Sequence, residues 1–347
     1  MRIGSFDIGS GNRPFIIAEM SGNHNQSLDK ALEIVQAAAR TGAHALKLQT
    51  YTADSITIDH RGGLFDIKDE KSLWKGRNLY QLYQEAHTPY EWHKPIFDLA
   101  NELGIICFST PFDEAAVDFL EAMRVPAYKI ASFENNHHPL LRKVASTGKP
   151  IIMSTGVSSL ADIAESVDVL RQAGCKDLVL LKCTSTYPST PENTNLLTIP
   201  HLSSMFHCDA GLSDHTMGIG VSVAAVALGA TVIEKHFCLD RAEGGVDSAF
   251  SLEPDEFASL VKETERAWQG LGIIQYGIQE AERNSLNFKR SIYVTADIEA
   301  GENFNHHNIR IIRPGDGLHP RYFESLIGKK VNKPLRRGTP LRLDDLL

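Results

Sequence analysis

The chain has 347 residues, of which 42% are hydrophobic, so it can bury one large core and a small second domain. Its formal net charge of −8 argues against a nucleic-acid-binding protein. The five cysteines form no C-x-x-C pair, which is typical of reduced thiols in a cytoplasmic protein. The sequence shows no signal peptide and no apolar run of about 18 residues, so it suggests neither secretion nor membrane insertion.

Most of the chain alternates short β-type runs with amphipathic helical runs. Strands are predicted at 15–20, 45–50, 104–110, 127–132, 150–155 and 177–184, and two further apolar runs follow at 208–212 and 231–233. Near-continuous apolar strands that alternate with helices favour a parallel sheet buried on both faces. Eight such units predict an α/β fold of the closed (β/α)8 TIM-barrel type. An open doubly wound sheet is the alternative, but no G-x-G-x-x-G follows the first strand.

Two regions depart from this alternation. Residues 51–87 form a long insert that is rich in glycine and aromatic residues, and we interpret it as a lid or a dimer element. Residues 286–347 contain short β-type runs, dense turns, and 11 basic against 7 acidic residues. We therefore predict a barrel domain over 1–270, a linker over 271–285 and a small basic β-rich domain over 286–347.

Polar side chains gather where the predicted strands end, and in a barrel these ends converge on the active site. They include Glu19, Lys47, Gln49, Thr110, Lys129, Ser132, Ser154, Ser185, Ser213 and Glu234. Any one of the hydroxyl residues could merely cap the next helix. The two lysines are harder to explain in this way, because a lysine in a buried strand must be paired or face a ligand. We therefore predict a cationic pocket for a small polyanion such as a phosphorylated carboxylic acid.

Two histidines, His215 and His236, follow the last two apolar runs. Consecutive strands of a parallel barrel bring both imidazoles to the same rim, about one strand spacing apart. With the carboxylates of Asp214 and Glu234 nearby, they predict an open divalent-metal site, and a purely structural pair of histidines is the alternative. For Asp214 we favour a role in orienting His215. Glu19 has its own alternative, as an ion-pair partner of Lys47.

Several motifs occur in an order that makes the chain resemble the sialic acid (N-acetylneuraminate) synthase family. They are Ile17-Ala-Glu-Met-Ser-Gly-Asn-His24, Lys47-Leu-Gln-Thr50, Phe108-Ser-Thr-Pro-Phe112, Tyr128-Lys-Ile-Ala-Ser132, Ser154-Thr-Gly156, Leu212-Ser-Asp-His215, Glu234-Lys-His236 and Ser251-Leu-Glu-Pro-Asp255. The similarity extends over essentially the whole chain. Residues 286–347, with Arg313-Pro-Gly-Asp-Gly317, resemble the antifreeze-protein-like (SAF) domain of that family.

The resemblance implies a condensation of phosphoenolpyruvate with the open-chain aldehyde of an amino sugar, with release of phosphate. It implies that His215 and His236 hold a divalent metal ion, Mn²⁺ in the first place and Mg²⁺ or Co²⁺ as alternatives, and that Glu19 is the acid/base group. Phosphoenolpyruvate would be held by Lys47, Lys129, Ser132, Ser154 and Ser213. The remaining substrate-binding positions are Gln49, Thr110, Ser185, Tyr187, Glu234 and Asp247, joined by Arg313 from the partner subunit of a domain-swapped homodimer.

Three stretches bear on the identity of the sugar, namely residues 79–93, 182–188 and 244–251. Family members that make N-acetylneuraminate tend to carry Asn where Ser185 stands and Gly-Pro-Asp-His where Gly245-Val-Asp-Ser248 stands. These departures favour a more apolar trideoxy sugar, because a sugar with fewer hydroxyls needs fewer polar partners. N-acetylmannosamine and the legionaminic acid precursor are the alternative substrates. A non-catalytic binding protein is the remote alternative, which intact Glu19 and the paired lysines and histidines disfavour.

Overall fold

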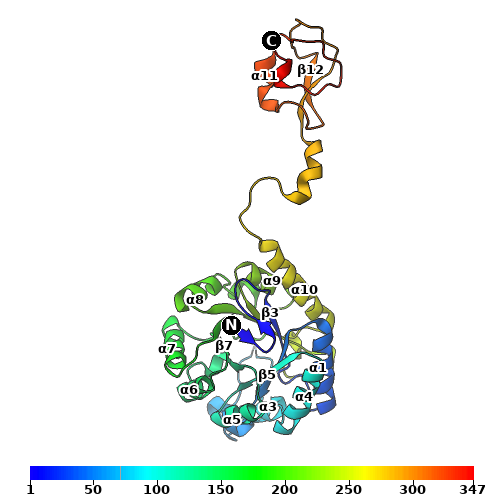
Figure 1. Ribbon diagram of the computed structural model, residues 1–347. Helices are drawn as coiled ribbons and strands as arrows, with labels where there is room; N and C mark the ends of the chain where they lie inside the picture. The colour runs from blue at the N-terminus through cyan, green and yellow to red at the C-terminus, as the bar shows by residue number, and fades with distance from the viewer. Residues whose placement is uncertain (71) are drawn as a thin grey trace. The chain divides into compact units, whose positions relative to one another are not determined.

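A computed structural model describes residues 1–70 and 72–347 of the chain, which folds into two compact units, Met1–Gly272 and Ile273–Leu347. Eight parallel strands of the first unit form a closed barrel, which confirms the predicted TIM-barrel fold (Figure 1). The strands are β3 (Phe15–Glu19), β4 (Ala45–Thr50), β5 (Ile106–Pro111), β6 (Tyr128–Ile130), β7 (Ile151–Ser154), β8 (Leu178–Cys183), β9 (Asp209–Asp214) and β10 (Val232–His236). They follow one another around the barrel in chain order, and β10 pairs with β3 to close it.

Helices surround the barrel and cover its outer face (Figure 1). They are α1 (Leu28–Thr41), α4 (Tyr90–Glu102), α5 (Glu114–Ala122), α6 (His138–Ser146), α7 (Leu160–Gln172), α8 (Thr198–Phe206), α9 (Gly220–Ala227) and α10 (Pro254–Leu271). Helix α1 shows how the sequence sets these limits. The Ser27 side chain caps its first turn by accepting a hydrogen bond from the Lys30 amide, and Gly42 ends it in the left-handed conformation at φ 83°.

The inside of the barrel changes from apolar to polar along each strand. Phe15, Ile17 and Val232 belong to an apolar cluster inside the barrel, and Ile3 and Ile8 at the N-terminus join the same cluster. Ile3 lies in a small hairpin formed by β1 (Arg2–Ile3) and β2 (Phe6–Asp7), which the sequence analysis did not predict. This packing fills the amino-terminal end of the barrel, so the only inward positions left for polar chemistry are those near the carboxyl ends of the strands.

The insert over residues 51–87 contains α2 (Ala53–Ile56), a 3-10 turn at Gly63–Phe65 and α3 (Leu79–Ala86). The second unit contains an antiparallel pair, β11 (Ser291–Val294) and β12 (Ile309–Ile312), the short helix α11 (Phe323–Leu326) and an apolar core of its own. The short β-type runs predicted for residues 286–347 are confirmed by this pair. In the described part of the chain, the structure shows no helix with the length and hydropathy of a membrane span.

Gly211 in β9 offers a test of how tightly the barrel is closed. A Cβ atom at this position would lie 2.1 Å from the Val232 carbonyl oxygen and 2.9 Å from Leu181 Cδ2. We expect Gly211→Ala to lower the free energy of unfolding by about 1–3 kcal/mol through overpacking, measured by urea denaturation. Gly270 in α10 has open space around it, so Gly270→Ala should raise stability by up to about 1 kcal/mol. A Gly211→Ala protein as stable as the Gly270→Ala protein would contradict this account.

Candidate active site

The polar ends of all eight barrel strands enclose one narrow cavity of about 60 Å³. Most residues proposed from the sequence line it. The lining residues are Glu19, Lys47, Gln49, Thr110, Phe112, Lys129, Ala131, Ser132, Ser154, Cys183, Tyr187, Ser213, His215, Glu234 and His236. Strands that are distant in sequence therefore present their side chains to one point, as the barrel topology requires.

Three residues proposed from the sequence do not line this cavity. Ser185 lies at its edge, with its Oγ 3.7 Å from the Sγ of Cys183. Asp247 lies behind His236, with Oδ2 3.8 Å from the histidine Nδ1. Arg313 belongs to the second compact unit, so its part in the site stays a prediction.

Four buried charges form the centre of the site. Lys47 contacts the Glu19 carboxylate, and its Nζ lies 3.8 Å from Glu234 Oε1 and donates to Thr110 Oγ1 at 3.1 Å. Lys129 Nζ lies 3.2 Å from the same Glu234 oxygen. Two lysines thus face two glutamates, and the cluster is formally neutral. The sequence predicted a cationic pocket, but carboxylates of the chain pair with both lysines, because buried ammonium groups need such partners.

Burial and pairing act on these charges in opposite directions. Burial raises the pKa of Glu19, against the opposing effect of the Lys47 ammonium. Burial likewise disfavours ionised Glu234, but Lys129 and Lys47 hold the pKa of that carboxyl below its usual value. Burial lowers the pKa of Lys129 in spite of Glu234. Glu19 is therefore the carboxyl of the pair that takes up a proton more readily, and Glu234 is the one that stays ionised.

The two histidines lie side by side at the rim, with ring centroids 5.3 Å apart. The Thr184 carbonyl oxygen lies 3.1 Å from His215 Nδ1, which leaves the other ring nitrogen free of this contact. His236 Nδ1 is buried and has no hydrogen-bond partner among the described residues. Burial, together with the neighbouring His215, lowers the pKa of His236 well below its usual value, so this ring is neutral, as a metal ligand must be.

The Asp214 carboxylate makes no contact with the His215 ring among the described residues, so an orienting role through direct contact is not seen and an indirect one stays a prediction. The Asp214 carboxylate accepts hydrogen bonds from the amide and hydroxyl of Thr216 and pairs with Lys235. The reason is strand alternation, since adjacent residues of a strand face opposite sides of the sheet. No group of three or more His, Cys, Asp or Glu side chains in the described ranges is arranged to hold a metal ion.

An aromatic wall stands beside the histidines. The ring of Tyr187 lies 4.5 Å from that of His215, and the Phe250 ring lies 4.8 Å from that of His236, measured between centroids. Trp74 of the insert packs on Tyr187 at 5.7 Å and donates from Nε1 to the Val246 carbonyl at 2.9 Å. The long insert therefore reaches the site through one tryptophan.

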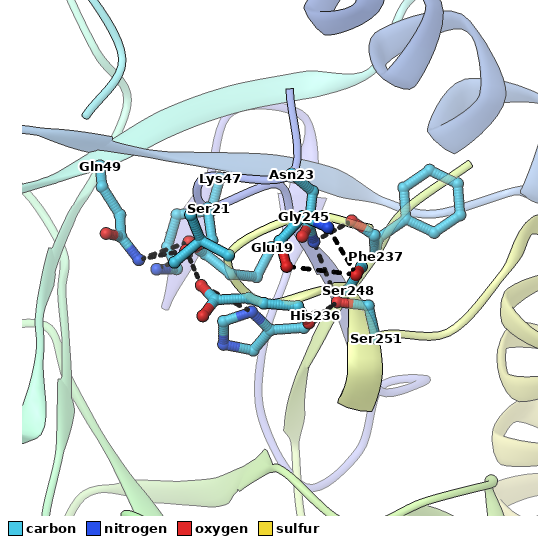
Figure 2. A network of polar contacts seen from close by, with 12 residues as sticks. Glu19, Ser21, Asn23, Lys47, Gln49, His236, Phe237, Gly245, Ser248 and Ser251 are labelled. Carbon is cyan, nitrogen blue, oxygen red and sulfur yellow. Dashed lines mark hydrogen bonds and ion pairs between the residues drawn. The ribbon is translucent and has the colours of Figure 1, made fainter. Parts of the chain in front are cut away.

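The structure adds residues that the sequence analysis did not assign. Ser21 donates a hydrogen bond to Asp247, and Gln49 Nε2 donates to both Ser21 Oγ and Glu19 Oε1 at 3.0 Å (Figure 2). This chain joins the acid/base candidate to Asp247. Ser21 lies within the 17–24 motif, which is the signal that could have identified it.

Two further additions are Glu134 and Cys183. Glu134 ends a 3-10 turn after β6 and has one buried carboxylate oxygen without a hydrogen-bond partner in the described structure. Cys183 ends β8, and its thiol lies 3.9 Å from His215 Nδ1. No pattern in the sequence predicts that either side chain lies at the site.

A TIM barrel with paired lysines, glutamates and histidines at its carboxyl rim is the architecture of a barrel enzyme. Residues 34–276 match the NeuB family, and residues 289–347 match the SAF domain. The chain belongs to the NeuB family.

Relatives of known name resemble this chain over nearly its whole length. A pseudaminic acid synthase from Campylobacter jejuni is 44% identical over 345 residues, which cover 99% of each chain. A pseudaminic acid synthase from Helicobacter pylori is 41% identical over 96% of this chain and 98% of its own. Among solved structures, a spore coat polysaccharide biosynthesis protein from Bacillus subtilis superposes with a TM-score of 0.67 at 35% identity, covering 100% of this chain and 99% of that one.

Glu134 generates a pH prediction. Burial raises its pKa to about 7 from 4.5, so between these values the folded chain keeps a proton that the unfolded chain has released. The free energy of unfolding should therefore fall as pH rises through this window, by about 1–3 kcal/mol relative to Glu134→Gln. Urea denaturation of both proteins at pH 5 and pH 7.5 measures the difference. Glu33→Gln, at an exposed position of α1, serves as control. Parallel pH profiles for wild type and Glu134→Gln would refute the assignment.

Proposed function

We propose that the protein is a pseudaminic acid synthase. It condenses phosphoenolpyruvate with 2,4-diacetamido-2,4,6-trideoxy-β-L-altropyranose and water, and it releases pseudaminic acid and phosphate. The observation that carries the proposal is the convergence of Glu19, Lys47, Lys129 and Glu234 beside His215 and His236 at the carboxyl rim of the barrel. The full-length similarity to pseudaminic acid synthases supports the choice of reaction and sugar.

Phosphoenolpyruvate would bind by replacing the glutamates as the ion-pair partners of the two lysines. Its carboxylate and phosphate would replace the Glu19 and Glu234 oxygens as partners of Lys47 and Lys129, which are ionised and already desolvated. Hydroxyl groups of Thr110, Ser132, Ser154 and Ser213 line the same cavity and can donate to the anion. Ser154 Oγ has no hydrogen-bond partner among the described residues, so this donor is available to a ligand. Such fixed donors hold the enol face in line for attack.

His215 and His236 fit a divalent metal ion, with Mn²⁺ as the first choice and Mg²⁺ or Co²⁺ as alternatives. The fit rests on their 5.3 Å spacing and on the buried, unpartnered Nδ1 of His236 in the described structure. When bound, the ion would supply Lewis-acid polarisation of the aldehyde oxygen. The chain's own contribution is to keep His236 neutral by burial and to set the tautomer of His215 through the Thr184 carbonyl. Burial opposes protonation of His215, but its contacts with Cys183 and with the Thr184 carbonyl raise the pKa of that ring.

Glu19 would move the proton. Its carboxylate is held by Lys47 and by Gln49 Nε2, and burial raises its pKa, so it can both accept a proton and return it. Occupation of Lys47 by the substrate would remove the cation that opposes protonation of Glu19. The carboxyl would then be ready to donate to the hydroxyl formed at the attacked carbon, or to take a proton from the water that adds at C2.

Tyr187 and Asp247 would contact the sugar. Burial raises the pKa of Asp247, and Ser21 and Gln49 link its carboxyl to Glu19. The surrounding wall of Trp74, Tyr187 and Phe250 is aromatic, which suits a sugar that lacks the hydroxyl at C6.

A homodimer is the assembly that we propose. Large apolar side chains at the start of the second unit are exposed, with Ile273 81%, Ile274 93% and Tyr276 94% accessible to solvent. Such a run is costly in a free monomer, and a second copy of the chain would cover it. In that arrangement Arg313 of one subunit would reach the sugar bound by its partner.

The assay that tests the function measures phosphate release from phosphoenolpyruvate with Mn²⁺ present, using three sugars in parallel. We expect kcat/KM for the trideoxy-altrose derivative to exceed that for N-acetylmannosamine by at least ~100-fold, because an apolar wall leaves the extra hydroxyls of that sugar unpaired. The legionaminic acid precursor has the same number of hydroxyls, so its turnover reports on sugar stereochemistry and we expect it to be lower. Turnover mainly with N-acetylmannosamine would preserve the reaction and refute the sugar. Absence of turnover with all three would refute the proposed activity.

Mixed subunits test whether Arg313 acts in the partner's site. We expect Glu19→Gln and Arg313→Ala homodimers each to lose at least ~100-fold in kcat. Subunit exchange at equal amounts should restore about a quarter of wild-type activity, because half the dimers are mixed and each has one complete site. A mixture no more active than its components, in protein shown by light scattering to be dimeric, would place Arg313 in its own subunit's site or in none.

A further inference from the structure

At the carboxyl ends of β9 and β10, successive side chains alternate between the cavity and the helical layer. Ser213 and Glu234 are paired across the strands and line the cavity. The next residues, Asp214 and Lys235, are also paired across the strands, and their side chains point to the helical layer, where Ser222 of α9 donates to Asp214 Oδ2 at 2.6 Å. The residues after them, His215 and His236, line the cavity again. The charged pair therefore lies directly behind the two histidines.

The pair is fully enclosed and fully partnered. Lys235 Nζ lies 2.8 Å from Asp214 Oδ2, and both side chains are 0% exposed. The other carboxylate oxygen accepts from the Thr216 amide at 2.8 Å and from its hydroxyl at 2.7 Å. Lys235 also donates to the Thr216 carbonyl at 2.6 Å. Neither side chain is among those that line the substrate cavity.

These contacts fix the backbone on both sides of His215. Asp214 and Thr216 are tied to Lys235, and the His215 carbonyl itself accepts from the Ser189 amide at 3.0 Å. Lys235 in turn lies directly before His236, and its pairing with Asp214 is the last of the β9–β10 register. One cross-strand ion pair thus fixes the backbone positions of His215 and His236, from which the two imidazoles extend toward the cavity.

Stability alone is a weak reason for such a pair. Hydrophobic residues of similar volume often serve a buried site equally well or better, because two charges must be desolvated to form the pair. What a charged, hydrogen-bonded pair adds is a defined geometry. We infer that Asp214 and Lys235 are positioning residues, which hold His215 and His236 at the spacing that a divalent metal ion requires. The inference rests on the proposed role of these histidines as metal ligands.

The test separates folding from metal binding. Lys235→Met leaves a buried carboxylate without its cation, whereas the double variant Asp214→Leu with Lys235→Met removes both charges. Leu120→Ala, in the buried face of α5, is a control that lowers stability by leaving a cavity. For each full-length protein we would measure Tm without metal, Mn²⁺ affinity from the electron paramagnetic resonance signal of free Mn²⁺, and phosphoenolpyruvate affinity by calorimetry.

We expect Lys235→Met to lower Tm and the double variant to regain part of that loss, because it removes the unpaired carboxylate but leaves the buried Thr216 and Ser222 donors without their acceptor. Both should bind Mn²⁺ at least ~10-fold more weakly, with phosphoenolpyruvate affinity unchanged within about twofold, because the pair does not touch Lys47 or Lys129. Leu120→Ala should lower Tm without changing Mn²⁺ affinity. Asp214→Asn keeps one carbonyl oxygen as an acceptor for the Thr216 amide and hydroxyl but loses the oxygen that pairs with Lys235, so it provides a second variant in which Mn²⁺ affinity should fall at least ~3-fold.

Recovery of both Tm and wild-type Mn²⁺ affinity in the double variant would overturn the inference, since the pair would then be a replaceable part of the core. The same holds if Asp214→Asn binds Mn²⁺ as wild type does. If the double variant His215→Ala with His236→Ala binds Mn²⁺ as tightly as wild type does, the proposed metal site is refuted, and the inference is refuted with it. The condensation assay with wild type distinguishes that result from failure of the proposed activity.

Discussion

The active-site end of this protein depends on Lys47, whose ammonium group lies between the carboxylates of Glu19 and Glu234. Without it, two buried carboxylates would face each other in a water-poor cavity, and one would have to take up a proton. With it, the site is neutral, hydrogen-bonded and preformed. Neighbouring strands also hold the two carboxylates, since Gln49 donates to Glu19 and Ser213 donates to Glu234.

That arrangement is possible because the rest of the barrel is apolar and closed. The cluster of Phe15, Ile17, Val232 and their neighbours fills the amino-terminal half of the interior, and Ile3 and Ile8 close it. Charged groups are thereby confined to one end, where the carboxyl ends of the strands meet the loops. The resulting low dielectric strengthens each contact made there, for the apo charges and for a bound substrate alike.

Because side chains alternate along a strand, the polar residues at the ends of β9 and β10 form two sets that face opposite sides of the sheet. Ser213, Glu234 and the histidines face the cavity, whereas Asp214 and Lys235 face the helices and bind each other. Adjacent residues in the sequence are therefore separated by the barrel wall. Proximity along the chain suggested that Asp214 contacts and orients the His215 ring directly, but the period of two along a strand turns its carboxylate to the opposite side of the sheet.

The sequence by itself determined the repeating βα units, the eight strands, the small C-terminal β domain and the strand-end residues that meet in the cavity. Hydrophobic periodicity and the fixed geometry of a parallel barrel are enough for that, because every strand must deliver its last inward side chain to the same rim. Motif order added the family and the reaction.

Tertiary structure decided which of these residues satisfy one another. Four features join positions far apart in the sequence. They are the pairing of Lys47 and Lys129 with Glu19 and Glu234, the link from Gln49 through Ser21 to Asp247, the packing of Trp74 on Tyr187, and the packing of Ile3 and Ile8 into the barrel. Such contacts depend on distances of a few ångströms between separate strands and loops. Periodicity along the sequence predicts which side of the sheet a side chain faces, but it does not predict which residue of the neighbouring strand that side chain contacts.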